Sequence, residues 1–301
     1  MDFNKERQNG VENVRTLGGF KPEVHREKEG CVYIYSGKNL TDVGERNGDV
    51  NLCKIGIPGG GEIDLLSILS PSHKPMDGLA VYVSDNGETI RWAKSDGVSE
   101  IGEYPNDSAL MADWLVRKVY DDNLLDNAED AVDSVENGMT SIGKKGAATI
   151  EYGEIKKGEY KWNIRMFRIG STRALKRGLV ATGSAGVSEA YHISRRDDDY
   201  NEPWFPNQKK RFVGYRSVGE RKTADPSSDE EFDINTATDG LNSLVGSMYR
   251  NTGRLTDRTL IEAVGKGNLL EGVRRLREDG YMSTSDDVSM ISIHLPKRSG
   301  R

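Results

Sequence analysis

Cysteine and histidine are scarce in this chain of 301 residues, which has two cysteines, Cys31 and Cys53, and four histidines. Two cysteines build neither a disulfide framework nor a closed zinc site, so the sequence predicts a reducing, intracellular and cytoplasmic setting. No histidine stands at metal-ligand spacing, and no cofactor is expected. No stretch approaches about 20 apolar residues, and the N-terminus has no apolar signal region, so neither a transmembrane span nor a secretory signal is predicted.

A recognisable catalytic signature is also lacking. Thr182-Gly183-Ser184-Ala185-Gly186 differs from a serine nucleophile turn, which needs glycine at the place of Thr182. Pro58-Gly59-Gly60-Gly61 is rich in glycine, but no Gly-Lys-Ser/Thr follows, so phosphate binding is not predicted there. The acidic run Asp197-Asp198-Asp199 suits a divalent cation, yet the adjacent Arg195 and Arg196 pair with it more simply. We therefore predict no metal site.

The composition is polar, with 35% hydrophobic residues and a mean hydropathy of −0.65. This apolar share lies below that of an average globular domain. The length permits one large domain or two of ordinary size. A core is expected, together with segments that attach to it loosely.

Two β-hairpins are predicted. Residues 79–84 and 88–93 have strand composition and flank Asp85-Asn86-Gly87, in which Asn-Gly favours the positive φ angles of a tight hairpin turn. Residues 148–152 and 160–169 form the second predicted hairpin. Its second strand loses its alternation near Phe167, which predicts a bulge or a strand end at that point.

Helical periodicity appears at 106–119, where Asn106 or Asp107 can cap the helix, and at 124–135, which Gly138 is expected to end. Apolar residues recur at helical spacing again between 239 and 280, and 290–295 is predicted to be a short strand. The fold class that follows is α+β, with antiparallel β-hairpins packed with helices and a helical C-terminal section.

Changes in composition along the chain predict five segments. They are a flexible N-terminal arm (1–30), a mixed β/α domain or subdomain (31–145), a basic β-rich subdomain (146–222), an acidic linker (223–238) and a helical C-terminal section (239–301).

The stretch 156–222 is basic inside an acidic protein. It holds 16 Lys and Arg against 7 Asp and Glu, so it carries +9, whereas the whole chain carries −6 and the remainder −15. A cluster of cations attracts polyanions and releases their counterions, and aromatic rings among the cations can stack on unpaired bases. The predicted nucleic-acid-binding residues are Arg173, Lys176, Arg177, Trp204, Phe205, Lys209, Lys210, Arg211, Phe212, Tyr215 and Arg216.

Two serines in the predicted acidic linker have the spacing of acidic-directed kinase sites. Glu230 lies three residues after Ser227, and Glu231 three residues after Ser228. Phosphate on either serine would add negative charge beside the basic stretch and weaken anion binding. We therefore predict phosphorylation at Ser227 and Ser228.

Together these features favour a non-enzymatic nucleic-acid-associated or assembly protein, of the kind found as a matrix, nucleocapsid or phosphoprotein component of a virion. The expected partners are nucleic acid, with RNA favoured, or an acidic protein, within a homo-oligomer; peripheral contact with an anionic membrane surface is left open. One alternative is an adaptor for an acidic protein. Another is an enzyme whose active site is assembled from residues distant in sequence, which a single sequence does not reveal.

Overall fold

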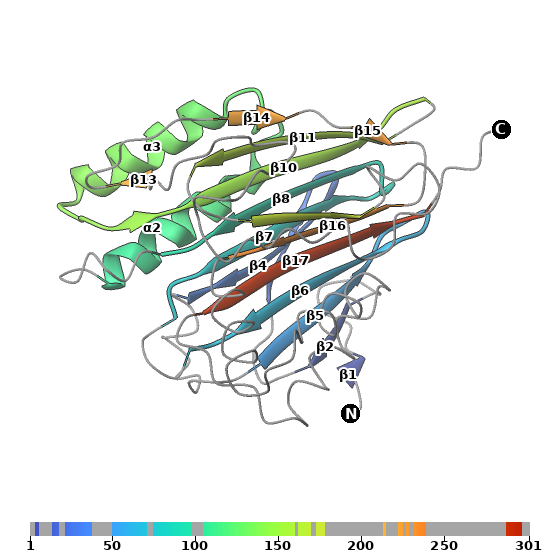
Figure 1. Ribbon diagram of the computed structural model, residues 1–301, viewed down its shortest axis with the longest axis horizontal. Helices are drawn as coiled ribbons and strands as arrows, with labels where there is room; N and C mark the ends of the chain where they lie inside the picture. Colours follow the sequence, from blue (N-terminus) through green and yellow to red (C-terminus); the bar gives the residue numbers. More distant parts are fainter. Residues whose placement is uncertain are drawn as a thin grey trace, which may run out of the picture.

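A computed structural model describes the protein at residues 4–5, 14–17, 22–37, 50–70, 75–97, 105–159, 162–169, 173–177, 213–214, 222–224, 227–228, 232–238 and 287–296. In these ranges the chain forms two large antiparallel sheets that lie face to face, with helices on one outer side (Figure 1).

Sheet A has the spatial order β1-β2-β5-β6-β17-β16-β12. Its strands are β1 (Asn4–Lys5), β2 (Val14–Leu17), β5 (Val50–Gly56), β6 (Glu62–Ile68), β17 (Val288–Leu295), β16 (Phe232–Ala237) and β12 (Arg173–Arg177). Although β17 comes last in the sequence, it lies between β6 and β16 and pairs with both.

Sheet B has the order β14-β11-β10-β8-β7-β4-β3, and β15 also pairs with β11. Its strands are β3 (Glu23–Glu27), β4 (Gly30–Ser36), β7 (Gly78–Ser84), β8 (Thr89–Ser95), β10 (Ile150–Lys157), β11 (Trp162–Ile169), β14 (Lys222–Ala224) and β15 (Ser227–Ser228). A small two-stranded sheet pairs β9 (Ala147–Ala148) with β13 (Val213–Gly214).

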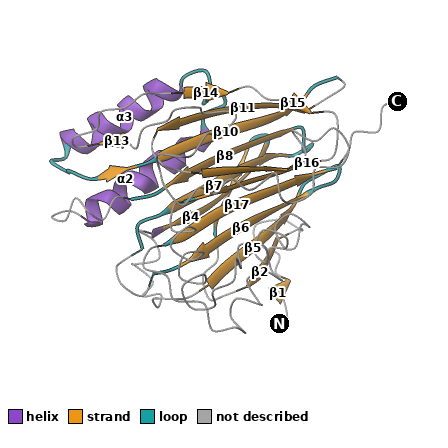
Figure 2. Ribbon diagram, in the orientation of Figure 1, coloured by secondary structure: helices purple, strands orange, loops and turns teal. Residues whose placement is uncertain are grey.

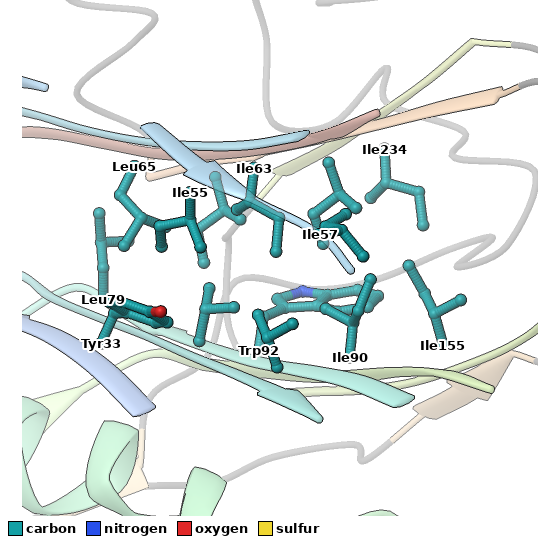
Figure 3. Packing of buried hydrophobic residues seen from close by; sticks show 14 of the residues in the cluster. Tyr33, Ile55, Ile57, Ile63, Leu65, Leu79, Ile90, Trp92, Ile155 and Ile234 are labelled. Carbon is teal, nitrogen blue, oxygen red and sulfur yellow. The ribbon is translucent and has the colours of Figure 1, made fainter. Parts of the chain in front are cut away.

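The apolar core fills the space between the two sheets. Successive strand residues point to opposite faces, so one alternate set from each sheet meets in the middle. Ile55, Ile63 and Leu65 of sheet A face Trp92 and Ile90 of sheet B in this layer (Figure 3). The packing at Trp92 depends on its cross-strand partner Gly153, where an added β-carbon would lie 1.9 Å from the indole ring.

The outer face of sheet B is covered by α2 (Pro105–Arg117), the short 3-10 helix η1 (Lys118–Tyr120) and α3 (Ala128–Ser141), drawn in purple in Figure 2. Apolar residues of these helices and of the outward sheet positions form a second buried cluster. The predicted stop at Gly138 is wrong, because α3 continues to Ser141. Gly138 instead lets the helix approach α2, since a β-carbon there would lie 2.8 Å from the Trp114 ring.

Both predicted hairpins are present. β7 pairs with β8 across a turn in which Gly87 has a φ of 67°, and β10 pairs with β11. Of the bulge or strand end predicted near Phe167, the bulge does not occur, because the register of β10 with β11 runs without interruption from Ile150 to Lys157. Arg168 therefore lies on the inner face and is buried there. β11 ends two residues after Phe167, at Ile169.

The predicted α+β class with antiparallel sheets and helices is confirmed. The predicted helical C-terminal section is not shown, because its described part, 287–296, contains the strand β17, and 239–286 lies outside the described residues. The division into five segments stays a prediction. Within the described ranges, no helix is long and apolar enough to cross a membrane.

Candidate functional site

Four strands end or begin at the same end of the sandwich, and each carries a polar residue there. In sheet B, Gly78 pairs with Ser95, which places Asp77, just before β7, opposite Asp96, just after β8. In sheet A, Thr238 directly follows β16 and Asp287 directly precedes β17. Residues distant in sequence thus meet where these strands of both sheets end, at one end of the sandwich.

Thr238 connects the two sheets at this end. Its hydroxyl donates to Oδ2 of Asp77 at 2.9 Å and accepts the backbone N–H of Ser289 at 3.0 Å. Its own backbone N–H donates to the carbonyl of Ser289 at 2.9 Å. Thr238 is fully buried, and the two contacts with Ser289 of β17 fix its hydroxyl in a position from which it orients the carboxylate of Asp77.

Asp287 holds the segment that crosses from sheet A to sheet B. Its Oδ1 accepts the backbone N–H of Ser70 at 2.8 Å, and its Oδ2 accepts that of Met76 at 2.8 Å. The two residues stand at the ends of the connection between β6 and β7. Since both carboxylate oxygens of Asp287 are already bonded to the backbone, this side chain positions the chain rather than serving as a free ligand.

Asp96 is fixed through its backbone. Its N–H donates to Oγ1 of Thr149 at 3.2 Å, and its carbonyl accepts the N–H of Thr149 at 2.8 Å. The next residue, Gly97, packs so closely that an added β-carbon would lie 2.8 Å from Cβ of Met76. The Asp96-Gly97 pair therefore combines a half-buried carboxylate with a backbone position that excludes any larger residue.

A buried polar row lies on the inner face of sheet B and consists of Lys94, Glu151 and Arg168. Lys94, in β8, stands two residues before Asp96, so the row lies next to the end of the sandwich. The register pairs Lys94 with Glu151 and Glu151 with Arg168. Nζ of Lys94 lies 3.6 Å from Oε2 of Glu151 and also donates to the hydroxyl of Thr236 in sheet A. Oε1 of Glu151 accepts the Thr236 hydroxyl at 2.6 Å and the indole N–H of Trp92 at 3.0 Å.

The chemistry of this end of the sandwich is that of hard oxygen donors. Carboxylates and hydroxyls suit Mg²⁺ or Mn²⁺ better than softer metals. Among the residues that the structure describes, no three His, Cys, Asp or Glu side chains are grouped to hold a metal ion. Two further aspartates border the described positions in sequence, because Asp239 follows Thr238 and Asp286 precedes Asp287; both lie outside the described residues.

The predicted nucleic-acid-binding role of the eleven residues named above stays a prediction. Arg173, Lys176 and Arg177 belong to β12 of sheet A, in which Arg173 pairs with Ala237, the residue before Thr238. The remaining residues of that set lie outside the described ranges: Trp204, Phe205, Lys209, Lys210, Arg211, Phe212, Tyr215 and Arg216.

Ser227 and Ser228 form β15, which pairs with Asn163 and Trp162 of β11. Their phosphorylation stays a prediction. The run Asp197-Asp198-Asp199, considered above as a cation site, lies outside the described residues.

Sequence reasoning missed Asp77, Asp96, Thr238 and Asp287. A usable signal was present, because Asp77-Gly78 and Asp96-Gly97 are Asp-Gly pairs at the start and the end of strands in the predicted hairpin of residues 79–93. The pair Asp239-Gly240 occurs after β16 in the same way. Only the pairing of the strands shows that Asp77 and Asp96 lie opposite each other.

No protein-family model and no curated protein matches the chain. Solved structures do match. A bacterial serine phosphatase carrying a point substitution is 13% identical, with a TM-score of 0.50, over 79% of this chain and 98% of that one. RsbX in complex with magnesium is 14% identical, with a TM-score of 0.47, over 91% and 99%. The catalytic domain of the serine/threonine phosphatase PstP with two manganese ions is 17% identical, with a TM-score of 0.40, over 72% and 91%.

These findings correct the functional prediction. The expected non-enzymatic, viral, RNA-binding protein is contradicted, because the fold shared with the bacterial serine phosphatase is that of an enzyme. The basic and aromatic composition of 156–222 misled the prediction, since charge describes a surface and does not identify a fold. The alternative of an enzyme with a site assembled from distant residues is better supported. The chain is an α+β protein with antiparallel sheets, and its fold is PP2C-like.

Proposed function

We propose that the protein is a metal-dependent phosphohydrolase that acts on phosphoserine or phosphothreonine. The observation that carries the proposal is the placement of Asp77 and Asp96 side by side at the end of the sandwich where both sheets meet. The structural likeness to a bacterial serine phosphatase supports it through the fold. This proposal replaces the expectation that no metal or cofactor is bound.

The residues present fit a divalent cation in their donor chemistry. Asp77 and Asp96 supply carboxylate oxygens in the described structure, and Asp239 and Asp286 are the further candidates by their position in the sequence. Mg²⁺ and Mn²⁺ prefer such ligands. When bound, a cation of this kind would polarise a phosphoryl oxygen and lower the pKa of a coordinated water.

The chain itself supplies positioning. Thr238 fixes the orientation of the Asp77 carboxylate, and the bonds between Thr149 and Asp96 fix the backbone at Asp96. Asp287 keeps the connection from β6 to β7 against β17, so the two sheets keep their relative position at the site. Because these groups are already in place, the protein would not have to rearrange them when a charged phosphoryl group binds or reacts.

The test is hydrolysis of p-nitrophenyl phosphate and of a phosphothreonine peptide by the full chain, with MnCl₂ or MgCl₂ and with EDTA. Asp96→Asn and Asp77→Asn should each lower kcat/KM by about a hundredfold or more, because each removes a charged oxygen ligand. Thr238→Val should lower it by about tenfold to a hundredfold through the orientation of Asp77.

The matched control is Asp130→Asn, which makes the same change of charge at an exposed position on α3. It should leave kcat/KM unchanged. If EDTA does not abolish hydrolysis, or if Asp96→Asn retains full activity, the proposed metal site is wrong. If no phosphoester of any kind is cleaved with either metal, the phosphohydrolase proposal is wrong.

A further inference from the structure

A polar hollow of about 450 Å³ lies on the outer face of sheet B, beside the turn between β7 and β8. Its lining includes Tyr82 of β7, Arg91 of β8 and Glu154 of β10, which are cross-strand neighbours in one row. Arg91 and Asp96 are five positions apart along the chain, on the order of 16 Å in an extended strand. The hollow is thus separate from the site proposed above.

Arg91 is held rigidly in this hollow. Its side chain is 2% exposed, and its guanidinium carbon lies 4.1 Å from the centre of the Tyr82 ring. Nη1 donates to the carbonyl of Asp121, and Nη2 lies 2.7 Å from Oδ1 of Asp122. Nε is buried and has no hydrogen-bond partner. The Nε and Nη2 edge, which can bind a carboxylate through two parallel bonds, therefore makes one of the two.

Glu154 is, like Arg91, a buried charged residue with one polar atom that lacks a hydrogen bond, but its charge is negative. Its side chain is 2% exposed, and Oε2 lies 2.9 Å from Nζ of Lys156. Oε1 is buried without a hydrogen bond, and Nη1 of Arg165 lies 3.9 Å from it. Although Glu154 is the direct cross-strand neighbour of Arg91, each of the two pairs with a different side chain.

Those pairing side chains lie at the surface. Asp122 is 87% exposed and Lys156 is 49% exposed. An exposed ion pair contributes little, because water screens it and a long side chain loses rotamer freedom in it. A buried charged group with an unsatisfied atom is costly by comparison. Asp122 and Lys156 can therefore be displaced, whereas Arg91 and Glu154 remain in place.

We infer that this hollow binds a small zwitterion of the free α-amino acid type. Its carboxylate takes the place of Asp122 and bonds both Nε and Nη2 of Arg91. Its ammonium takes the place of Lys156 and donates to Oε1 of Glu154. A molecule with both groups on one carbon matches two opposite charges on adjacent strands. The inference does not depend on the phosphohydrolase proposal.

Calorimetric titration of the full chain with glycine, L-serine and L-glutamine, in buffer containing EDTA, tests this directly. The matched probes are N-acetyl-L-serine, which lacks the ammonium, and L-serine amide, which lacks the carboxylate. At least one amino acid should bind, and its two blocked analogues should bind at least about tenfold more weakly, because each loses a charge-assisted bond.

Two exposed substitutions sharpen the result. Asp122→Asn and Lys156→Gln should each tighten binding severalfold, because each removes an internal group that competes with the ligand. Asp130→Asn, with the same change of charge on α3, should leave the affinity unchanged. Glu154→Gln should weaken binding at least about tenfold; its circular dichroism and melting temperature show whether it is folded.

Absence of binding by all three amino acids at about 10 mM, a concentration that detects even millimolar affinity, overturns the inference. So does equal binding of the blocked analogues, which would indicate a polar hollow without zwitterion recognition. Weaker binding in Asp122→Asn would likewise contradict the displacement of Asp122. Binding that Asp96→Asn leaves intact, as expected, separates this site from the candidate metal site.

Discussion

At the scale of single residues, Lys94 and Glu151 are the least expected feature of the interior. Both side chains are fully buried between the sheets, and their charged atoms lie 3.6 Å apart. Taking charges out of water is expensive, and the cost is offset only when the remaining polar atoms are bonded. Here Thr236 and Trp92 provide those bonds to Oε1 of Glu151, whereas Oε2 is buried without a hydrogen bond and has the Lys94 ammonium as its charged neighbour.

We expect Lys94→Met to lower the free energy of unfolding by about 3 kcal/mol, because it leaves the buried Glu151 carboxylate without the Lys94 ammonium that lies 3.6 Å away. The double variant Lys94→Met/Glu151→Gln should recover much of this loss, since Gln keeps an acceptor for Thr236 and Trp92. Urea denaturation of both single variants and of the double variant gives the coupling energy. A coupling below about 0.5 kcal/mol would show that the two charges act independently.

At the scale of elements, the hairpins and helices could be predicted, whereas the site could not. The Asn86-Gly87 turn and the helical spacing within 106–135 are local signals, and the structure follows them. The contact between Thr238 and Asp77 joins residues that are 161 positions apart. No local pattern encodes such a contact, because strand order decides it. The basic composition of 156–222 is also a local signal, but it describes charge and does not show how the strands are arranged.

The pair of strands β5 and β6 carries a group whose ionisation should affect stability. Lys54 and Asp64 are cross-strand partners, and Nζ of Lys54 lies 2.8 Å from Oδ1 of Asp64. Burial raises the pKa of Asp64 to about 6, although the Lys54 ammonium acts in the opposite direction. The unfolded pKa is about 4, so the folded protein binds this proton more tightly.

Asp64 should therefore contribute stability below about pH 4 and lose that contribution as the pH rises to about 6. We expect the free energy of unfolding of Asp64→Asn, relative to the unsubstituted protein, to rise by up to about 3 kcal/mol between pH 4 and pH 7. Denaturation at several pH values measures this difference. Glu62→Gln, which alters a more exposed neighbour of the same Lys54, is the control. A difference that stays flat with pH would show that Asp64 is not the group that titrates.

At the scale of the whole molecule, Asp287 holds the connection between the two sheets at the candidate site. It accepts the backbone N–H of Ser70, at the sheet A end of the connection, and that of Met76, at the sheet B end. Asp287→Asn can accept at most one of these N–H groups with its carbonyl oxygen and presents an N–H donor to the other. We expect a loss of about 2–4 kcal/mol in unfolding free energy, because a charge-assisted bond is lost and a buried donor is left unsatisfied.

Amide hydrogen exchange of Ser70 and Met76 should accelerate in Asp287→Asn more than exchange within α3. Asp130→Asn serves again as the variant with an equal change of charge. Equal exchange rates in the two variants would show that Asp287 does not hold the connection between the sheets.

The position of β17 in the middle of sheet A has a consequence for synthesis on the ribosome. Six strands of sheet B, namely β3, β4, β7, β8, β10 and β11, lie between residues 23 and 169, so most of that sheet can assemble while later residues are still being added. Sheet A cannot be completed until residues 288–295 emerge from the ribosome, because β6 and β16 pair with β17 and not with each other. Until then the nascent chain exposes an unpaired strand edge, which is where chaperones and wrong strand partners compete.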